Sequence, residues 1–237
     1  LKALEEPVRQ IAANAGLEED PWAGVRLRPD DSQSRRELTM DELKRLLSAA
    51  KTAGEEWHRL FVIGIYTGLR LGDCCRLDWS SINIPQQIIQ LIPSKTRRHA
   101  HGRPITIPIH PALGESLLSG IEQSDQSINR SILSGPVLPM IAEMYRAGRY
   151  RVSDRLSGIF KAANIKTSIQ IEGRKNRTPV ATFHSLRHSF VSFSANAGVP
   201  LHIVQSIVGH ESTAMTRHYY HESVDSLRKA VAAIPTL

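Results

Sequence analysis

The segment that most constrains the fold of this chain is 58–67, which is apolar over nearly its whole length. A helix that lacks a polar face has to be covered by other elements, so this segment predicts a buried helix. Gly68 is expected to end it, because glycine is the usual residue just past a helix C-terminus. A further helix is predicted over 71–77, and Arg70 therefore falls at the junction of two helices.

The next helix signal lies upstream of this segment. Thr39 and Glu42 have the spacing of a capping box, and leucines recur after them at helical intervals, which predicts a helix over 40–53. Further helices are expected over 112–163, with an interruption around 119–139, and over 183–197, 201–208 and 213–220. Core positions are assigned to Phe190, Phe193, Leu201 and Met215.

Two short runs rich in β-branched residues, 88–92 and 105–109, predict a pair of strands. The basic stretch between them is expected to form the long loop of a hairpin. Residues 165–179 are polar and basic and are predicted to form a loop. The fold class is therefore α+β and mainly α-helical, with a small antiparallel sheet or hairpin.

The chain is expected to divide unevenly. Residues 1–20 are predicted to be the tail of a helix, and 20–34 have the polar, turn-rich composition of a linker. Segment 1–35 is therefore assigned to the tail of a preceding domain with its linker, and 36–237 to the main domain. Because the chain begins with leucine, it is expected to be a fragment of a longer protein.

Charge and cysteine usage indicate the partner and the compartment. The 237 residues carry 30 Lys and Arg against 23 Asp and Glu, a net charge of +7 that favours a nucleic-acid partner without proving one. Cys74 and Cys75 are adjacent in a predicted helix, so a mutual disulfide is not expected and a reducing compartment fits. No apolar run approaches the roughly 20 residues of a membrane span. We therefore expect a cytoplasmic protein without a membrane partner.

The chemistry-bearing residues gather in the last fifth of the chain. His184 and Arg187 lie in one short motif, His210 follows a glycine, and Tyr219 comes nine residues after that histidine. An arginine can grip a phosphate through two hydrogen bonds, a histidine can exchange protons near neutral pH, and a tyrosine can act as an oxygen nucleophile. This combination indicates phosphate chemistry for which no metal needs to be assumed.

The whole pattern resembles the catalytic domain of the tyrosine recombinase and phage integrase family. Four boxes carry the resemblance, which covers roughly residues 36–225. Residues 67–73 (Thr-Gly-Leu-Arg-Leu-Gly-Asp) are similar to the first arginine box, and 94–96 (Ser-Lys-Thr) to the lysine turn of a β-hairpin. Residues 184–190 are similar to the second box, and 208–210 together with 215–221 to the third.

The resemblance implies a tyrosine recombinase fold and six catalytic residues: Arg70, Lys95, His184, Arg187, His210 and Tyr219. Tyr219 would attack a DNA phosphodiester and form a 3′-phosphotyrosyl link, so that rejoining needs neither ATP nor another cofactor. The two arginines and His210 would bind the phosphate, His184 would assist deprotonation of Tyr219, and Lys95 would protonate the departing 5′ oxygen. Asp73 would support the first arginine box.

Several other interpretations of these residues remain open. Arg70 and Arg187 could instead bond helix ends or carboxylates. His184 and His188 have the spacing of a helical metal pair, but no acidic residue or cysteine cluster completes a zinc site. Tyr220 is adjacent to Tyr219, and only one of the two can face the arginines because neighbours on a helix point about 100° apart.

The function implied is that of a site-specific DNA recombinase, or integrase. The alternatives are a type IB topoisomerase-like relaxing or resolving enzyme and a noncatalytic DNA-binding regulator. The resemblance further implies double-stranded DNA as the partner, a homo-tetramer on DNA that is a monomer when free, accessory DNA-bending proteins and association with the nucleoid. Segment 1–35 would then end an N-terminal DNA-clamping domain, and 222–237 would form a C-terminal docking segment.

Overall fold

In the computed structural model the chain forms two units, Leu1–Ser34 and Arg35–Leu237. The structure describes residues 8–12, 14–16, 35–94, 104–123, 134–171 and 176–209. In the first unit residues 8–12 are helical. The predicted helix over 213–220 and the docking segment lie outside the described residues. No helix in the described part of the chain is long and apolar enough to cross a membrane.

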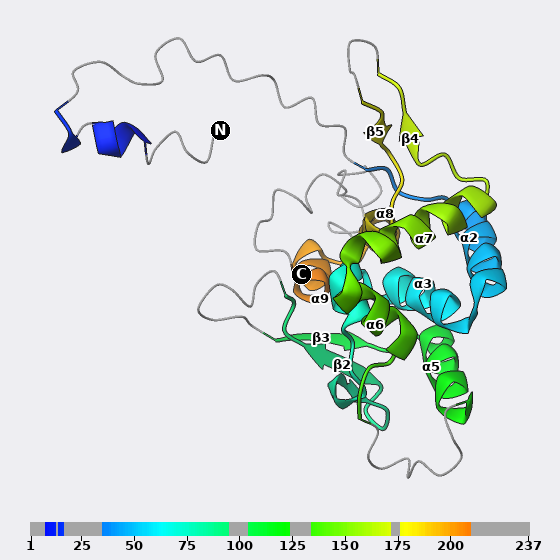
Figure 1. Cartoon of the computed structure of the whole chain (residues 1–237). Coiled ribbons are helices and arrows are strands. Elements are labelled where there is room, and N and C mark those ends of the chain that lie inside the picture. The colour runs from blue at the N-terminus through cyan, green and yellow to red at the C-terminus, as the bar shows by residue number, and fades with distance from the viewer. Residues whose placement is uncertain are drawn as a thin grey trace, which may run out of the picture. The chain divides into compact units, whose positions relative to one another are not determined.

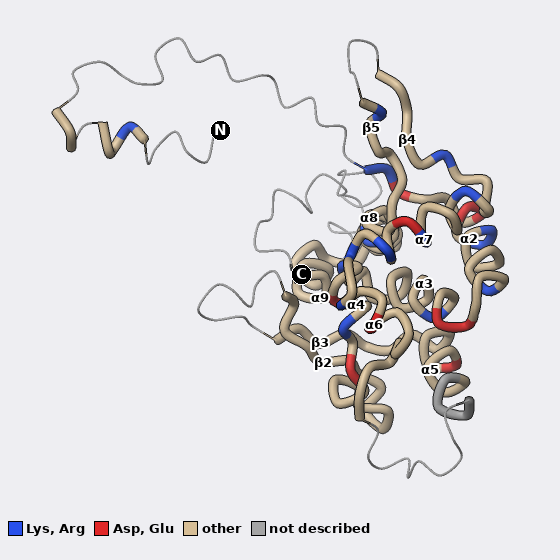
Figure 2. Tube along the Cα trace, in the orientation of Figure 1, with Lys and Arg blue, Asp and Glu red and all other residues tan. Residues whose placement is uncertain are grey.

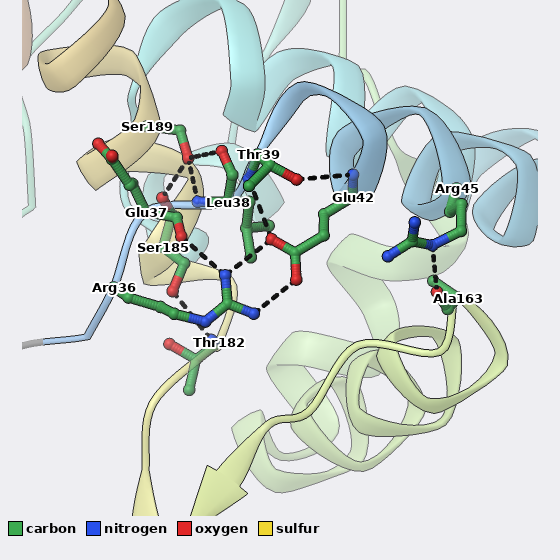
Figure 3. Close-up of polar contacts among 10 residues, drawn as sticks. All are labelled: Arg36, Glu37, Leu38, Thr39, Glu42, Arg45, Ala163, Thr182, Ser185 and Ser189. Atoms are coloured by element: carbon green, nitrogen blue, oxygen red, sulfur yellow. Dashed lines mark hydrogen bonds and ion pairs between the residues drawn. The ribbon is translucent and has the colours of Figure 1, made fainter.

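The second unit begins with a strap, residues 35–39, that leads into helix α2 (Met40–Ala53). The predicted bounds and the capping box are both confirmed: the Glu42 amide donates to Thr39 Oγ1 (3.2 Å), and the Thr39 amide donates to Glu42 Oε2 (3.0 Å). Arg36 adds a two-pronged ion pair with Glu42, at 2.7 and 2.5 Å (Figure 3). The beginning of α2 is therefore held by contacts among residues 36–42.

The strap is also bound to a helix far along the chain. The Leu38 amide donates to Ser189 Oγ (2.8 Å), and the Arg36 amide donates to the carbonyl of Val180 (2.9 Å). Arg45 Nε of α2 donates to the carbonyl of Ala163 (3.1 Å), as Figure 3 also shows. These contacts join the first segment of the unit to parts of the chain more than a hundred residues later.

Helix α3 (Glu55–Thr67) is the buried helix that the apolar segment predicted. It begins three residues earlier than expected, and it ends at Gly68, whose φ of 63° is left-handed and favours glycine. Helix α4 (Leu71–Cys75) is two residues shorter than predicted. It stops there because the Leu77 carbonyl leaves the helix to accept a hydrogen bond from the Val137 amide (2.9 Å).

A three-stranded antiparallel sheet confirms the predicted hairpin and adds a strand to it. Its order is β1 (Ile82–Asn83), β2 (Ile88–Leu91) and β3 (Ile105–Pro108), after the short 3-10 helix η1 (Trp79–Ser81). Strand β1 was not predicted, since two residues are too few to show a period. Ile89 pairs with Ile107, and both are buried, so one face of the sheet packs on the core.

The predicted helical region 112–163 resolves into three helices: α5 (Pro111–Gln123), α6 (Pro139–Ala147) and α7 (Arg149–Ala162). Helix α5 continues into the expected interruption. The prediction of a plain loop over 165–179 was wrong at both ends, because β4 (Ser168–Ile169) and β5 (Thr178–Pro179) form an antiparallel pair. Figure 1 shows this pair projecting beside α7.

Helices α8 (His184–Asn196) and α9 (Leu201–Val208) lie close to their predicted bounds. The assignment of Phe193 to the core was wrong: its side chain is 37% exposed. It lies two turns past Leu186 on nearly the same side of α8, near the C-terminal end of the helix, where residues 193–198 are exposed or half-buried. Phe190 packs against a small cluster of Val191, Val204 and Val208.

Helices α3 and α8 approach each other closely at Gly64. A Cβ atom at this position would lie 2.7 Å from Cζ of Phe183 and 2.8 Å from Cδ1 of Leu186. Phe183 immediately precedes α8, and Leu186 lies in its first turn. The missing side chain at Gly64 thus sets the distance between the central helix and the helix that carries His184 and Arg187.

We predict that Gly64→Ala lowers the free energy of unfolding by about 1–3 kcal/mol, because the new methyl group forces α3 and α8 apart. Urea unfolding measures the change. Gly158→Ala is the matched control: this glycine lies inside α7, a Cβ atom added to it would have no neighbour within 4 Å, and alanine there should stabilise the protein by about 0.5–1 kcal/mol. Equal effects of the two substitutions would contradict the close packing.

Candidate active site

The guanidinium of Arg187 is buried behind the candidate site and is not among the groups that line its pocket. Arg187 belongs to α8 and is only 2% exposed. Its guanidinium joins the ends of two other helices. Nη1 donates to the carbonyl of Gly68 (2.8 Å), and Nη2 donates to the carbonyl of Val208 (2.6 Å). The carbonyl end of a helix carries a partial negative charge, which attracts a cation. Arg187 therefore holds together the C-terminal ends of α3 and α9.

Arg70 follows one of these helix ends. It is the residue that precedes α4, as predicted, and it is half-buried. Together with Ser94 and His184 it lines a pocket of about 660 Å³. Among the described residues, no hydrogen bond or ion pair engages the Arg70 guanidinium. Its donors are therefore available to a ligand in this pocket.

His184 begins α8 and is half-buried in the same pocket. Burial lowers its pKa to about 3, and the nearby charges of His188, Arg187, Arg35 and Arg70 act in the same direction. Its ring packs edge-on against His188, with ring centroids 4.9 Å apart. The imidazole is therefore neutral at neutral pH, and an anion bound among these positive charges would raise its pKa and make it a better proton acceptor.

The same positive surroundings act on Arg187. Burial and the charge of Arg70 lower the pKa of Arg187 to about 9, while Asp73 and Cys74 oppose the change. Arg187 stays protonated at neutral pH. Two arginines that repel each other beside a neutral histidine make an environment that favours an anion.

Asp73 connects the first arginine box to the hairpin. Its buried carboxylate accepts a hydrogen bond at Oδ1 from the Ser94 amide (2.9 Å) and lies 3.8 Å from Nη2 of Arg76. In the described part of the chain Oδ2 has no hydrogen-bond partner. Ser94 is the last described residue before the hairpin loop, and Lys95 follows it. Asp73 thus fixes the point from which the loop leaves the domain.

Gly209 brings a third segment to the same place. Its φ of 64° is left-handed, and it ends α9. A Cβ at this position would lie 3.4 Å from Cγ of Pro93 and 3.6 Å from Cγ2 of Ile105, so the end of α9 contacts both ends of the hairpin. Lys95, His210 and Tyr219 themselves lie outside the described residues, and their assigned roles stay predictions.

The pocket also contains three arginines that the sequence motifs did not indicate: Arg35, Arg76 and Arg149. Arg35 lies at the start of the strap, where the sequence suggested only a linker. Arg76 is six residues past Arg70 and could have been noticed as a second cation after the first box. Arg149 had no signal, because it reaches the pocket only through the packing of α7. Figure 2 shows basic segments at the start of the strap and at the start of α7.

Metal and thiol chemistry have little support among the described residues. No group of three or more His, Cys, Asp or Glu side chains is placed to hold a metal ion in this part of the chain. Cys74 and Cys75 are free and buried, and burial raises the pKa of Cys75 to about 12. Both thiols therefore stay protonated and serve as core side chains.

Comparison with known proteins decides the family. The model of the phage integrase family matches residues 36–225. The chain belongs to this family. Tyrosine recombinase XerA of Thermococcus kodakarensis is 28% identical over 195 residues, and tyrosine recombinase XerC of Mycobacterium leprae is 25% identical over 198 residues. Each alignment covers 81% of this chain but only 60% of the relative, so the chain spans less than two thirds of their length.

Solved structures confirm the fold class. The Tn1549 transposon integrase, in complex with a circular intermediate DNA, has a TM-score of 0.68 at 17% identity, and the match covers 98% of this chain and 77% of that one. A lambda integrase dimer bound to a core site has a TM-score of 0.59 at 22% identity, and the match covers 94% of this chain and 72% of that one. The mainly helical domain with a small antiparallel sheet is therefore the fold of integrase catalytic domains.

We predict that Arg187→Met lowers the free energy of unfolding by about 2–4 kcal/mol, because two buried carbonyl groups lose their donor. Arg187→Lys should lower the free energy of unfolding by less, since an ammonium keeps the charge but reaches fewer acceptors. Chemical denaturation compares both with Arg151→Gln, an exposed arginine on α7 whose substitution should change stability by no more than about 0.5 kcal/mol. If Arg187→Met had the same free energy of unfolding as the unmodified protein, the Arg187 bridge would not be what holds the two helix ends together.

We predict that His184 makes the protein less stable in acid. Its folded-state pKa of about 3 lies below the ordinary 6.5, so between these values the unfolded chain binds a proton that the folded protein does not. The free energy of unfolding therefore falls as the pH is lowered through this window. Urea unfolding at about pH 7.5 and about pH 5 should show a smaller decrease in His184→Gln than in the unmodified protein. Some decrease should remain, because burial also lowers the pKa of His58; an equal decrease in both proteins would contradict the assignment.

Proposed function

We propose that this chain is the catalytic part of a site-specific DNA recombinase that cuts and rejoins double-stranded DNA through a 3′-phosphotyrosyl intermediate. One observation carries the proposal. Arg70 and a neutral His184 share a pocket next to the buried Arg187, and the described residues that line this pocket include no Asp or Glu. Such a pocket favours a phosphate and supplies a group that can accept a proton.

The first step of the proposed reaction is a transesterification. The hydroxyl oxygen of Tyr219 attacks the scissile phosphorus while its proton passes to the neutral imidazole of His184. The bond from phosphorus to the 5′ oxygen breaks, and Lys95 donates the proton that this oxygen requires. The number of phosphoester bonds is unchanged, so attack by a 5′-hydroxyl reverses the step without ATP or another cofactor.

The arginines act on the charge that develops at phosphorus. Arg70 has donors free of protein partners in the described structure, and it would bind a nonbridging oxygen directly. Arg187 binds two helix ends and would add a fixed positive charge beside the phosphate. His210 would donate a further hydrogen bond. Arg187 thus both stabilises the fold and contributes to the site, and the structural and catalytic interpretations of this arginine are compatible.

The family relatives support double-stranded DNA as the substrate. The two relatives of similar sequence are named recombinases, and of the two structures of similar fold one was determined with a circular intermediate DNA and the other bound to a core site. We extend the proposal to a homo-tetramer on DNA that dissociates to monomers, with the C-terminal segment 222–237 docked on a neighbour. The first 35 residues would then end a DNA-clamping domain. We also propose that accessory DNA-bending proteins are partners of this protein and that it is associated with the nucleoid.

A covalent-capture experiment tests the nucleophile. The protein is incubated with nicked duplexes from the DNA that flanks its gene, and adducts that survive denaturant are separated and sequenced. We expect a protein–DNA adduct with the unmodified chain and with Tyr220→Phe, and none with Tyr219→Phe, because only the phenol of Tyr219 is assigned to attack phosphorus. An undiminished adduct in Tyr219→Phe would refute the assignment. Relaxation of supercoiled DNA by a monomer, without exchange of strands between duplexes, would instead favour a topoisomerase-like enzyme.

A further inference from the structure

We propose that the part of the pocket formed by Arg76 and Arg149 binds a second phosphate of the same DNA backbone, next to the scissile phosphate. This inference rests on the proposed function and extends it. It assigns two residues outside the six catalytic positions to the DNA interface, and it gives a physical role to a surface that the sequence motifs do not cover.

The pocket is larger than the catalytic residues need. Its volume of about 660 Å³ corresponds to more than twenty water molecules at about 30 Å³ each. Arg70, Ser94 and His184 account for only part of its lining. The remainder includes α6, α7 and the segments around β4 and β5, which contribute polar side chains beside the apolar Leu156, Phe160 and Pro179; the polar ones are Tyr145, Arg149, Ser153, Ser157, Thr167 and Ser168.

Arg76 is held in place by the protein before any ligand arrives. Its guanidinium lies over the ring of Tyr145, 5.3 Å from the centroid, and Nη2 lies 3.8 Å from Oδ1 of Asp73. Arg76 and Tyr145 meet over Gly72, where a Cβ would lie 2.8 Å from the Tyr145 hydroxyl oxygen and 2.9 Å from Nη2 of Arg76. A cation whose side chain is already ordered loses less conformational entropy when it binds an anion.

Arg149 supplies the second cation, from helix α7. It is the first residue of α7 and is exposed, and within the described residues its guanidinium has no hydrogen-bond or ion-pair partner. Ser153 and Ser157 follow at intervals of four residues, so all three lie on one face of α7 and line the same pocket. Arginine and serine side chains are typical ligands of backbone phosphates in DNA complexes.

The positive charge of the pocket is more than one phosphate needs for neutralisation, and it suits two. Its described lining contains four arginines, from the strap, α4 and its flanks, and α7, and no carboxylate. Successive phosphates of one DNA strand each carry a negative charge, so a strand that places one phosphate at Arg70 has another close by. Arg76 and Arg149, which line the same pocket, would neutralise it. Contacts of this kind fix the register of the DNA without reading its sequence.

The salt dependence of DNA binding tests the inference. Arg149→Gln removes the charge, Arg149→Lys keeps it, and Arg151→Gln is the matched control, because Arg151 is an exposed arginine of the same helix that lines a different hollow, between α6 and α7. Each protein is titrated at several salt concentrations with one duplex from the DNA that flanks the gene, chosen by footprinting. Loss of one phosphate contact should make the slope of log affinity against log salt shallower by about 0.9 in Arg149→Gln. Arg149→Lys and Arg151→Gln should keep the slope of the unmodified protein.

Formation of the covalent adduct is measured in parallel at saturating DNA, so that the two proposals can fail separately. If the unmodified protein forms the adduct and Arg149→Gln has the same slope as Arg151→Gln, the second phosphate site is refuted and the recombinase proposal stands. If no adduct forms but the slope changes only in Arg149→Gln, the phosphate contact is supported and the recombinase proposal fails. A slope that changes equally in Arg149→Gln and Arg151→Gln also refutes the site, because the effect is then one of general charge.

Discussion

The bridge that Arg187 makes between two helix ends is the interaction on which the rest of the site depends. Its guanidinium binds the carbonyls of Gly68 and Val208, and it is almost wholly buried. Burying a charge is costly unless it is compensated, and here the negative ends of two helices provide the compensation. The segments that leave these ends begin the first arginine box on one side and lead to His210 on the other. A stabilising contact of the fold therefore also sets the position of the chemistry.

A second set of contacts fixes the edge of the pocket at the beginning of the domain. The strap is held by the Leu38 amide on Ser189 Oγ and by the ion pair of Arg36 with Glu42, both drawn in Figure 3. Ser189 lies in the same helix as Arg187, so the strap and the candidate site share α8. The strap thereby brings Arg35 to the pocket. The point where the linker enters the domain is thus part of the proposed DNA-binding surface.

Capping motifs and hydrophobic periodicity predicted most of the helices, but they did not predict strands that are defined only by pairing with another segment. The beginning of α2 follows from a capping box that four consecutive residues contain, and the end of α3 follows from one left-handed glycine. The β4–β5 pair was missed because each strand has two residues, and only their mutual hydrogen bonds define them. Phe193 was placed in the core because it is aromatic, although the packing of α8 leaves it partly exposed.

The sequence by itself determined which residue types are available and in which motifs they lie. The residue types and spacing around Arg70, His184 and Arg187 indicate phosphate chemistry, because arginines can grip a phosphate and a histidine can exchange protons near neutral pH. Only the tertiary structure decided that Arg76 and Arg149 line the same pocket, and that burial among positive charges makes His184 neutral. The physical reason is that spacing along the chain encodes local geometry, whereas the lining and the electrostatics of a pocket are sums over segments that meet only when the helices pack.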